Sequence, residues 1–485
     1  MSAAPEHVDV LIVGAGISGI GAACRLKERC HGKSFLILEA RARMGGTWDL
    51  FRYPGIRSDS DMYTLGFPFR PWRGEKAIVE GEAIRTYVEE TARDYGVEGA
   101  IRFGHKALSA VWSPADARWT VQAEADGETR RFSCAFLYMA SGYYDYEAGY
   151  RPDWPGEADF AGRIVHPQFW PDDLDVAGKR VVIIGSGATA VTLAPALAER
   201  GARVTMLQRS PSYVVSRPSR DRLAPKIGAR LTRWKNVLLG AYFFKRARTK
   251  PDKVRAAIRK LAAGDLPPGY EIDRHFNPAY NPWDQRVCLI PDADLFRAIG
   301  EGKVEMVTDR IARFTKDGIA LESGGEVKAD IVVTATGLIV KQLGGMTFVL
   351  DGAPVTIADR LSYKGIMLSD VPNLAVCFGY TNASWTLKSD LTALWVCKLL
   401  NRMDKAGAAT ATPVLGDEEV ERRPMLDFSS GYIDRARDAL PKQGAAPPWQ
   451  VLQNYPRDVL ALRFGRLEDG VLRFGRLTPV PERAT

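Results

Sequence analysis

The sequence contains few of the residues that build disulfide frameworks and metal sites. Its 485 residues include six cysteines and five histidines. The cysteines are Cys24, Cys30, Cys134, Cys288, Cys377 and Cys397. None of them forms a CxxC pair or the CxxxxC pair of a redox-active disulfide, so reduced thiols are expected. Because the histidines show no metal-ligand spacing, the sequence predicts no metal site.

Long apolar runs are also missing. No stretch approaches the roughly 18 uncharged apolar residues that a membrane-spanning helix needs. The first residues, Met1 to Glu6, lack the charged and apolar regions of a secretion signal. With 46% hydrophobic and 26% charged residues, the composition is that of a globular protein with room for two or three domains. These features together predict a cytoplasmic protein.

Two glycine-rich turns are present, and each indicates a dinucleotide site. In the first, Gly14, Gly16 and Gly19 follow the apolar run 8–13 and precede a helical pattern, with Ser18 inside the turn. This order of strand, turn and helix is the context that a GxGxxG motif needs to place a pyrophosphate at a helix start. Glu39 ends the next apolar run, where an acid binds a ribose diol. The first turn therefore predicts an FAD site.

The second turn follows the apolar run 180–184. It consists of Gly185, Ser186, Gly187, Ala188, Thr189 and Ala190. The strand that comes after it ends in Arg209 and Ser210 instead of an acid. A guanidinium accepts the 2′-phosphate that a carboxylate would repel, so the second turn predicts NADPH. Two such cofactors on one chain indicate that electrons pass between them.

Positive charge is concentrated in one segment. The net charge is +8, yet residues 220–260 hold fourteen Lys and Arg against two Asp, around an apolar run at 237–244. A basic, partly apolar helix could make weak peripheral contact with an anionic membrane face. The alternative that the pattern favours is a helical insertion whose solvated basic face attracts NADPH. Because no nucleic-acid-binding motif accompanies the charge, nucleic acid is not an expected partner.

Two longer motifs carry a family resemblance. Phe160–Pro171 matches the pattern FxGxxxHxxxW(P/D), and Gly45–Asp59 matches (A/G)GxWxxxx(F/Y)P(G/M)xxxD. With both glycine-rich turns, the chain resembles the class B flavoprotein monooxygenases of the type I Baeyer–Villiger kind over nearly its full length. Trp170 favours this branch over the flavin-containing N/S-monooxygenases, which carry Tyr or Phe there. The runs 49–61 and 379–387 are similar to the ethionamide-activating subgroup.

The resemblance implies a reaction. NADPH would reduce FAD, a C4a-peroxyflavin would form with O₂, and ketones would become esters or lactones, with sulfides or thioamides also oxidised. Arg286 matches the arginine that stabilises the negative charge of the peroxide and of the adduct. Asp59 matches the carboxylate paired with it. Gln285 stands where many relatives carry a lysine that reaches the 2′-phosphate, so NADPH preference would depend on Arg209 and Ser210.

The resemblance also implies cofactor contacts. The residues expected to contact FAD or the nicotinamide half of NADP around the second motif are Thr47, Trp48, Asp49, Leu50, Arg57, Ser58 and Asp59. Ala107 matches a position whose backbone touches the adenine end of FAD. His166 is expected to anchor the linker between domains by hydrogen bonds instead of acting as a base.

The order of the motifs predicts an α/β fold with two Rossmann-like dinucleotide-binding domains and a helical insertion. The expected segments are 1–145 and 341–485 for the FAD domain, 146–171 for the linker with the fingerprint, 172–215 and 281–340 for the NADP domain, and 216–280 for the basic insertion. Within the first part, we expect a helix near 81–95 and strands around 106–113, 118–124 and 131–139. Two copies of Arg-Phe-Gly-Arg-Leu, at 463–467 and 473–477, predict a β-hairpin.

Three other functions are weighed against this one. A flavin-containing N/S-monooxygenase without ester-forming activity is the alternative, and Trp170 and Arg286 argue against it. A flavin-binding redox sensor would bind FAD without turning over NADPH. A flavin disulfide reductase is disfavoured because the chain has no redox-active cysteine pair.

Overall fold

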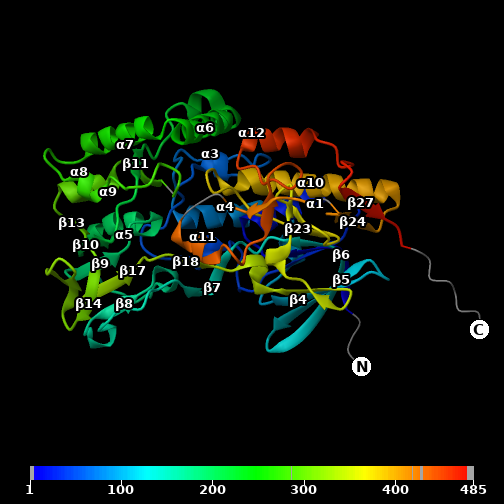
Figure 1. Ribbon diagram of the computed structural model, residues 1–485, viewed down its shortest axis with the longest axis horizontal. Coiled ribbons are helices and arrows are strands. Elements are labelled where there is room, and N and C mark those ends of the chain that lie inside the picture. Colours follow the sequence, from blue (N-terminus) through cyan, green and yellow to red (C-terminus); the bar gives the residue numbers. More distant parts are fainter. Residues whose placement is uncertain (1–4, 286, 418, 427–429, 478–485) are drawn as a thin grey trace, which may run out of the picture.

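Two sheets, one in each of two neighbouring lobes, organise the chain (Figure 1). The structure is a computed structural model that describes residues 5–285, 287–417, 419–426 and 430–477. The larger sheet has nine strands in the order β20-β19-β4-β5-β6-β1-β2-β3, with β23 also paired to β6. The smaller has five strands in the order β13-β10-β9-β17-β8. Mixed α/β architecture with two Rossmann-like sheets is thus the fold, as the motif order predicts.

The strands of the larger sheet are β1 (Glu6–Val13), β2 (Phe35–Leu38), β3 (Ile101–Arg102), β4 (Lys106–Ser113), β5 (Arg118–Ala125), β6 (Glu128–Met139), β19 (Thr347–Leu350), β20 (Ala353–Pro354) and β23 (Leu374–Val376). Those of the smaller are β8 (Arg163–Val165), β9 (Arg180–Ile184), β10 (Arg203–Gln208), β13 (Val304–Thr308) and β17 (Ile331–Thr334). All four pairings within the smaller sheet are parallel.

Short ribbons connect the two sheets or extend from them. They are β7 (Tyr144–Gly149) with β18 (Leu338–Val340), β11 (Val214–Arg217) with β12 (Cys288–Pro291), β14 (Ile311–Thr315) with β15 (Gly318–Leu321) and β16 (Glu326–Lys328), β21 (Ser362–Tyr363) with β22 (Met367–Leu368), β24 (Thr410–Pro413) with β27 (Leu472–Gly475), and β25 (Arg422–Pro424) with β26 (Lys442–Gly444).

The helices are α1 (Ile17–Arg29), α2 (Thr47–Leu50), α3 (Met62–Leu65), α4 (Gly81–Asp94), α5 (Ala188–Glu199), α6 (Ala224–Thr249), α7 (Pro251–Asp265), α8 (Ile272–His275), α9 (Asp294–Gly300), α10 (Trp385–Ala406), α11 (Gly431–Ala436) and α12 (Tyr455–Asp458). In Figure 1, α6 and α7 lie along one side of the molecule, α7 above the smaller lobe and α6 near the junction of the lobes, and α12 lies beside α6. Within the described ranges, every helix is too short or too polar to cross a bilayer.

Much of the secondary structure agrees with the sequence patterns. The strands expected around 106–113, 118–124 and 131–139 are β4, β5 and β6, and the helix expected near 81–95 is α4. The segment expected to be helical and basic contains α6, α7 and α8. These elements have strong local signals, either strict alternation of apolar residues or an apolar stripe at helical spacing.

The predicted hairpin near the C-terminus is wrong. The first Arg-Phe-Gly-Arg-Leu copy begins at the end of a π-helical turn, Val459–Phe464, and the second lies around β27. β27 pairs with β24 instead, and Thr410 faces Gly475 in that register. Similar pentapeptides thus adopt different structures because their tertiary partners differ.

One loop belongs to the cores of both lobes. Leu50, Phe51 and Tyr53 leave the side of the larger sheet and are buried among side chains of the smaller one, including Val181 and Ile183. Gly55, at φ +76, lies so close to α5 that an added Cβ would approach a side chain there to 2.7 Å. The second sequence motif therefore joins the two lobes as well as lining a site.

Two buried ion pairs hold α10 in place. Arg25 of α1 donates from Nε to Oδ1 of Asp390 over 2.7 Å. Lys388 Nζ lies 3.0 Å from Oδ2 of Asp458, and each of these two side chains is 3% exposed. The hydroxyl of Tyr380 donates to the same oxygen over 2.5 Å. Burial lowers the pKa of Lys388, an effect that Asp458 opposes.

All six cysteines are buried and free of disulfides. Burial raises the pKa of Cys24 to about 12 and that of Cys377 to about 11. It also raises the pKa of Cys134, whose side chain lies in the larger sheet. Reduced, packed thiols are therefore what the cysteine spacing predicts and what the structure contains.

Lys388→Met should lower the free energy of unfolding by about 3–5 kcal/mol, because it leaves the Asp458 carboxylate buried without its cation. Urea titration followed by circular dichroism measures this change. The double variant Lys388→Met/Asp458→Asn should recover most of the loss, since Tyr380 can still donate to the amide oxygen. Equal losses in the single and double variants would contradict the assignment of the cost to an unpaired carboxylate.

Candidate active site

A cavity of about 580 Å³ lies where the two lobes meet, and both glycine-rich turns contribute to it. The predicted site residues that line it are Gly14, Gly16, Ser18, Glu39, Thr47, Trp48, Arg57, Ser58, Asp59, Ala107, Ala188 and Thr189. Residues about 170 positions apart in the chain thus meet at one site. A cleft of this size between two domains is typical of cofactor sites.

Three helices begin at this cavity. The N-terminal residues of α1, α5 and α10 line it through Ile17, Ala188 and Trp385. None of the three helices has a side-chain cap, and none has an acidic residue in its first turn. Uncapped helix starts present free N–H groups and the positive end of the helix dipole. The cavity is therefore suited to anionic phosphates and to negative charge on a bound ring.

The first turn has the geometry of a pyrophosphate cradle. Gly14 is at φ +105, and an added Cβ would lie 2.6 Å from the carbonyl oxygen of Ala140. At Gly19 an added Cβ would lie 1.9 Å from the oxygen of Gly14, because the helix packs closely on the strand. Gly16 forms a bridge with Gly45 of the second motif. Only glycine fits at Gly14 and Gly19, so the backbone of this turn can come close to a ligand.

Glu39 holds this turn from the neighbouring strand. Its Oε2 accepts from the Ala15 N–H over 2.7 Å, and its Oε1 accepts from the Arg41 N–H over 2.9 Å. The side chain is 5% exposed, and burial raises its pKa despite these hydrogen bonds. A carboxylate fixed at the end of β2 and lining the cavity suits a ribose diol.

Asp49 and Leu50 do not line the cavity. The carboxylate of Asp49 is 3% exposed and forms ion pairs with three arginines, of which the Arg41 pair is 2.6 Å long. Leu50 is packed in the core of the smaller sheet. Within the second motif, Asp49 and Leu50 therefore support the loop, and other residues of the same loop line the cavity.

The second turn has the same architecture in the smaller sheet. Gly185 is at φ +141, and an added Cβ would lie 2.3 Å from the oxygen of Ala335. Gly187 precedes α5, Ala190 is fully buried, and Ser186 accepts a hydrogen bond from Ser212 over 2.9 Å. This turn reaches the shared cavity through its last residues, Ala188 and Thr189.

Arg209 and Ser210 lie at the outer edge of this lobe. They directly follow β10, and both are exposed. Arg209 does not line the shared cavity, which is expected for a side chain that would contact the adenosine end of an extended dinucleotide. The guanidinium is accessible to a phosphate at that edge.

Side chains of the second motif also contact the smaller lobe directly. Tyr53 of the second motif hydrogen-bonds to Thr189 of the second turn, and burial raises the pKa of Tyr53 to about 12. Arg57 pairs with Asp294 over 2.5 Å, while its Nη2 atom is buried without a partner among the described residues. A buried N–H group without a partner in the cavity wall fits a polar ligand atom. The residues present thus fit a flavin dinucleotide together with a nicotinamide dinucleotide.

Aromatic residues that the sequence patterns do not single out cover one wall. The rings of Tyr143 and Trp385 stack at 5.2 Å, and Phe378 and Tyr432 pack against the same Tyr143 ring. Trp385 donates from Nε1 to Oγ of Ser18 over 2.8 Å, which fixes its ring above the first turn. An added Cβ at Gly379 would lie 2.3 Å from this ring. In the sequence, the run 379–387, which is similar to the ethionamide-activating subgroup, contains Trp385 and so could have indicated this wall.

His166 lies outside the cavity lining and anchors the linker. Its Nε2 is 3.3 Å from the carbonyl oxygen of Gly337, and its Nδ1 accepts from the Gln168 N–H. An added Cβ at Gly149 would lie 2.0 Å from the ring. Burial lowers the pKa of His166, while its hydrogen bond to the Gly337 carbonyl opposes this effect. The expectation that His166 forms hydrogen bonds in the linker is therefore confirmed.

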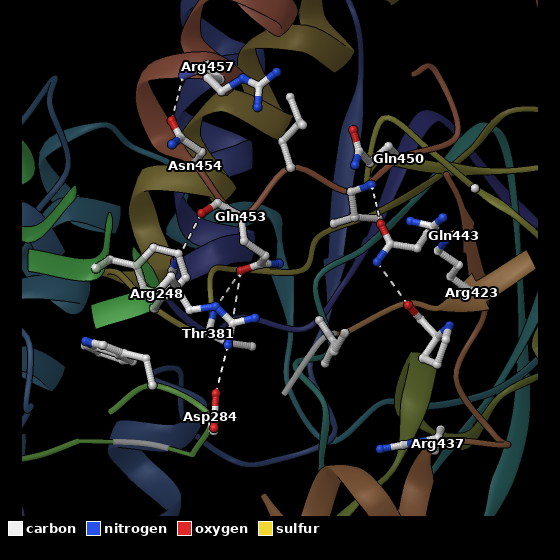
Figure 2. Close-up of a pocket in the computed structure, with 18 residues that line it drawn as sticks. Arg248, Asp284, Thr381, Arg423, Arg437, Gln443, Gln450, Gln453, Asn454 and Arg457 are labelled. Carbon is white, nitrogen blue, oxygen red and sulfur yellow. Dashed lines mark hydrogen bonds and ion pairs between the residues drawn. The ribbon is translucent and has the colours of Figure 1, made fainter. Parts of the chain in front are cut away.

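A second cavity, of about 850 Å³, adjoins the first (Figure 2). Thr381 lines both, and its N–H donates to Oε1 of Gln453 over 3.1 Å. Trp283 and Asp284 line the second cavity, and Arg248 of α6 donates to Asp284 over 2.9 Å. Its described lining also includes the arginines Arg423, Arg437 and Arg457. The charged residues of this wall are therefore mostly arginines, set among neutral polar and apolar side chains.

Arg286, the arginine expected to act in catalysis, lies outside the described residues. Its neighbours in sequence are described on both sides. Gln285 bridges to Pro282, and Val287 is buried before β12.

Comparisons with known proteins agree with this site. The family described as Pyridine nucleotide-disulphide oxidoreductase matches residues 11–255. The FAD-containing monooxygenase EthA of Mycobacterium tuberculosis is 54% identical over 485 residues, covering 98% of this chain and 99% of that protein. A steroid monooxygenase bound to NADP has a similar structure, with a TM-score of 0.75 and 22% identity. The match covers 97% of this chain and 100% of that one. Cyclohexanone monooxygenase from Rhodococcus sp. Phi1 bound to NADP+ has a TM-score of 0.74 and 20% identity. This match covers 98% of this chain and 100% of that one.

The two structural neighbours share the fold, and the monooxygenase relative extends over essentially the whole chain. The family resemblance carried by the two long motifs is thereby confirmed, as is FAD as a cofactor. The chain belongs to the FAD-containing monooxygenases.

Proposed function

We propose that the protein is a Baeyer–Villiger monooxygenase. It inserts one oxygen atom of O₂ into ketones to give esters or lactones, and it oxidises sulfides or thioamides as soft nucleophiles. The observation that carries this proposal is that Thr381 lies in the walls of both cavities. A second space of about 850 Å³ beside the cofactor cavity supports a small organic substrate held next to the flavin.

The names of the structural neighbours support the ketone part of the proposal, since one acts on cyclohexanone and another on a steroid. Trp170 and the whole fingerprint 160–171 support it from the sequence. The alternative is a flavin-containing N/S-monooxygenase without ester-forming activity. The two differ in product, because only the first converts a ketone to an ester.

Bound FAD, once reduced by NADPH, supplies the chemistry that activates O₂. The chain's own residues bind and orient the cofactors and stabilise negative charge beside them. The uncapped starts of α1, α5 and α10 stabilise negative charge in the cavity. Glu39 holds a ribose, and Arg209 with Ser210 holds the 2′-phosphate. The aromatic wall around Tyr143 and Trp385 excludes water from the flavin side.

We further propose that Arg286 supplies the fixed cation of the reaction, with Asp59 as its carboxylate partner. An arginine stays protonated at any working pH and can stabilise the oxyanion that develops on the ketone oxygen. Asp59 lines the flavin cavity, and Trp283 and Asp284, just before Arg286 in the chain, line the adjoining one. This arrangement supports a cation at the boundary between cofactor and substrate.

Purified enzyme with NADPH and air should convert a cyclic ketone to the lactone and a thioether to the sulfoxide, with products identified by mass spectrometry. Sulfoxide without lactone, across a panel of ketones, would favour the N/S-monooxygenase instead. NADPH consumption without oxygenated product from any substrate would exclude both.

Arg286→Ala should reduce ester formation by about 10²–10³-fold, the usual loss when one donor to an oxyanion is removed. Flavin reduction by NADPH, followed anaerobically at 450 nm, should change little. Arg274→Ala is the matched control, because this arginine is exposed and lines neither cavity. Ester formation at the wild-type rate in Arg286→Ala would show that the assigned role is wrong.

Arg209→Ala should raise the KM for NADPH by about tenfold or more, which is the loss expected for hydrogen bonds to a charged phosphate. The KM for NADH should stay nearly constant, since NADH has no 2′-phosphate. Steady-state oxidation of each nucleotide measures the two values. Equal increases for NADPH and NADH would count against a contact with the 2′-phosphate.

A further inference from the structure

Helix α6 presents a stripe of apolar side chains to solvent. Its members are Leu223, Ile227, Leu231, Trp234, Leu238 and Tyr242, spaced by three or four residues and between 37% and 62% exposed. We call this set the apolar stripe. Leu239 beside it is also exposed. Buried apolar faces hold most surface helices against a protein core, so an apolar stripe on the outer side needs another partner.

The stripe lies on the side of α6 that faces away from the protein. Gly228 has non-helical backbone angles and separates the start of α6 from the rest of the helix. With 3.6 residues per turn, the stripe members beyond it, from Leu231 to Tyr242, fall within an arc of about 80°. The buried positions Arg233, Val237 and Ala247 lie on the other side. Arg233 donates through Nη1 to the carbonyl oxygens of Tyr63, Thr64 and Gly66 at the end of α3. These contacts fix the orientation of the helix, and so the stripe stays outward.

Neighbouring structure extends this apolar surface. The ring of Tyr455 in α12 lies 5.8 Å from that of Trp234. The turn that follows α12 exposes two more large apolar side chains, Leu460 at 66% and Phe464 at 69%. Figure 1 shows α12 and α6 side by side on one face of the molecule.

The charge around the stripe identifies the partner. Residues 220–260 carry fourteen basic and two acidic side chains, while the rest of the chain is net negative. Lys226, Arg230 and Lys245 are exposed on α6 itself. Two copies of this surface facing each other would repel, so the charge disfavours self-association. An apolar stripe flanked by basic residues, on a helix that cannot span a bilayer, is complementary to an anionic lipid surface.

We propose that the protein docks peripherally on anionic phospholipid membranes through the apolar stripe, with the flanking lysines and arginines at the headgroups. The stripe residues enter the boundary between headgroups and acyl chains, and α6 lies in the plane of the interface. Docking is independent of the oxygenation chemistry, since it needs no turnover.

The same helix connects the docking surface to the substrate cavity. Phe244 and Arg248, in the last turns of α6, line the second cavity shown in Figure 2. Val237 packs against Tyr380, which lines the flavin cavity. A protein docked in this way holds its substrate cavity next to the membrane, where apolar ketones and sulfides concentrate.

The test is cosedimentation of the FAD-loaded enzyme with vesicles, without substrate. Vesicles of phosphatidylcholine with phosphatidylglycerol should bind the wild-type protein, and pure phosphatidylcholine should bind it more weakly. Leu231→Ser/Leu238→Ser should weaken binding on the order of tenfold for each leucine removed from the interface. Lys226→Glu/Arg230→Glu should remove the preference for the anionic lipid.

Leu108→Ser/Val414→Ser is the matched control, because both residues are apolar, 38% exposed and outside the stripe. It should bind vesicles as the wild type does. All variants should consume NADPH with a short soluble ketone at the wild-type rate, which verifies their fold. Wild-type protein that stays in the supernatant, or a stripe variant that binds equally well, would overturn the proposal. Sedimentation velocity that shows a dimer abolished by the stripe variant, without vesicle binding, would assign the surface to self-association instead.

Discussion

The burial of a single loop from one lobe in the core of the other constrains the whole site. Leu50, Phe51 and Tyr53 are packed among residues of the smaller sheet, while their neighbours at 45–48 contact the first glycine-rich turn. Tyr53 also hydrogen-bonds to Thr189 of the second turn. Because apolar side chains of this size are costly to expose, the distance between the two nucleotide turns is tied to the integrity of both cores. Electron transfer between two cofactors depends on such a fixed distance between their binding sites.

Helix starts contribute to the electrostatics of the site beside charged side chains such as Arg57, Lys106 and Lys341. Three helices begin at the flavin cavity with neither a side-chain cap nor an acid in the first turn. The nearby carboxylates are already engaged: Glu39 accepts two backbone N–H groups, and Asp49 pairs with three arginines. The cavity thus retains a positive potential although acidic residues lie close to it. This potential suits phosphates and developing negative charge in both of the proposed reactions.

Sequence patterns predicted the parts of the fold that depend on local constraints. The turns at 14–19 and 185–190 could be found because close strand–helix packing allows only glycine at certain positions. The motif 45–59 was harder to interpret, because lining residues such as Arg57 alternate with core residues such as Leu50. The aromatic wall and the second cavity combine segments from Tyr143 to Arg457, whose proximity no local pattern encodes. The terminal repeats show the same limit, since β24 rather than the other copy pairs with β27.

The position of the thiols has a consequence for the lifetime of this enzyme. Any flavin oxygenase releases some hydrogen peroxide, and peroxide attacks the thiolate form of cysteine. Here every cysteine is buried, and the burial of Cys24, Cys134 and Cys377 disfavours their ionisation. Burial therefore protects Cys24, Cys134 and Cys377 against sulfenic acid formation when peroxide is released beside them.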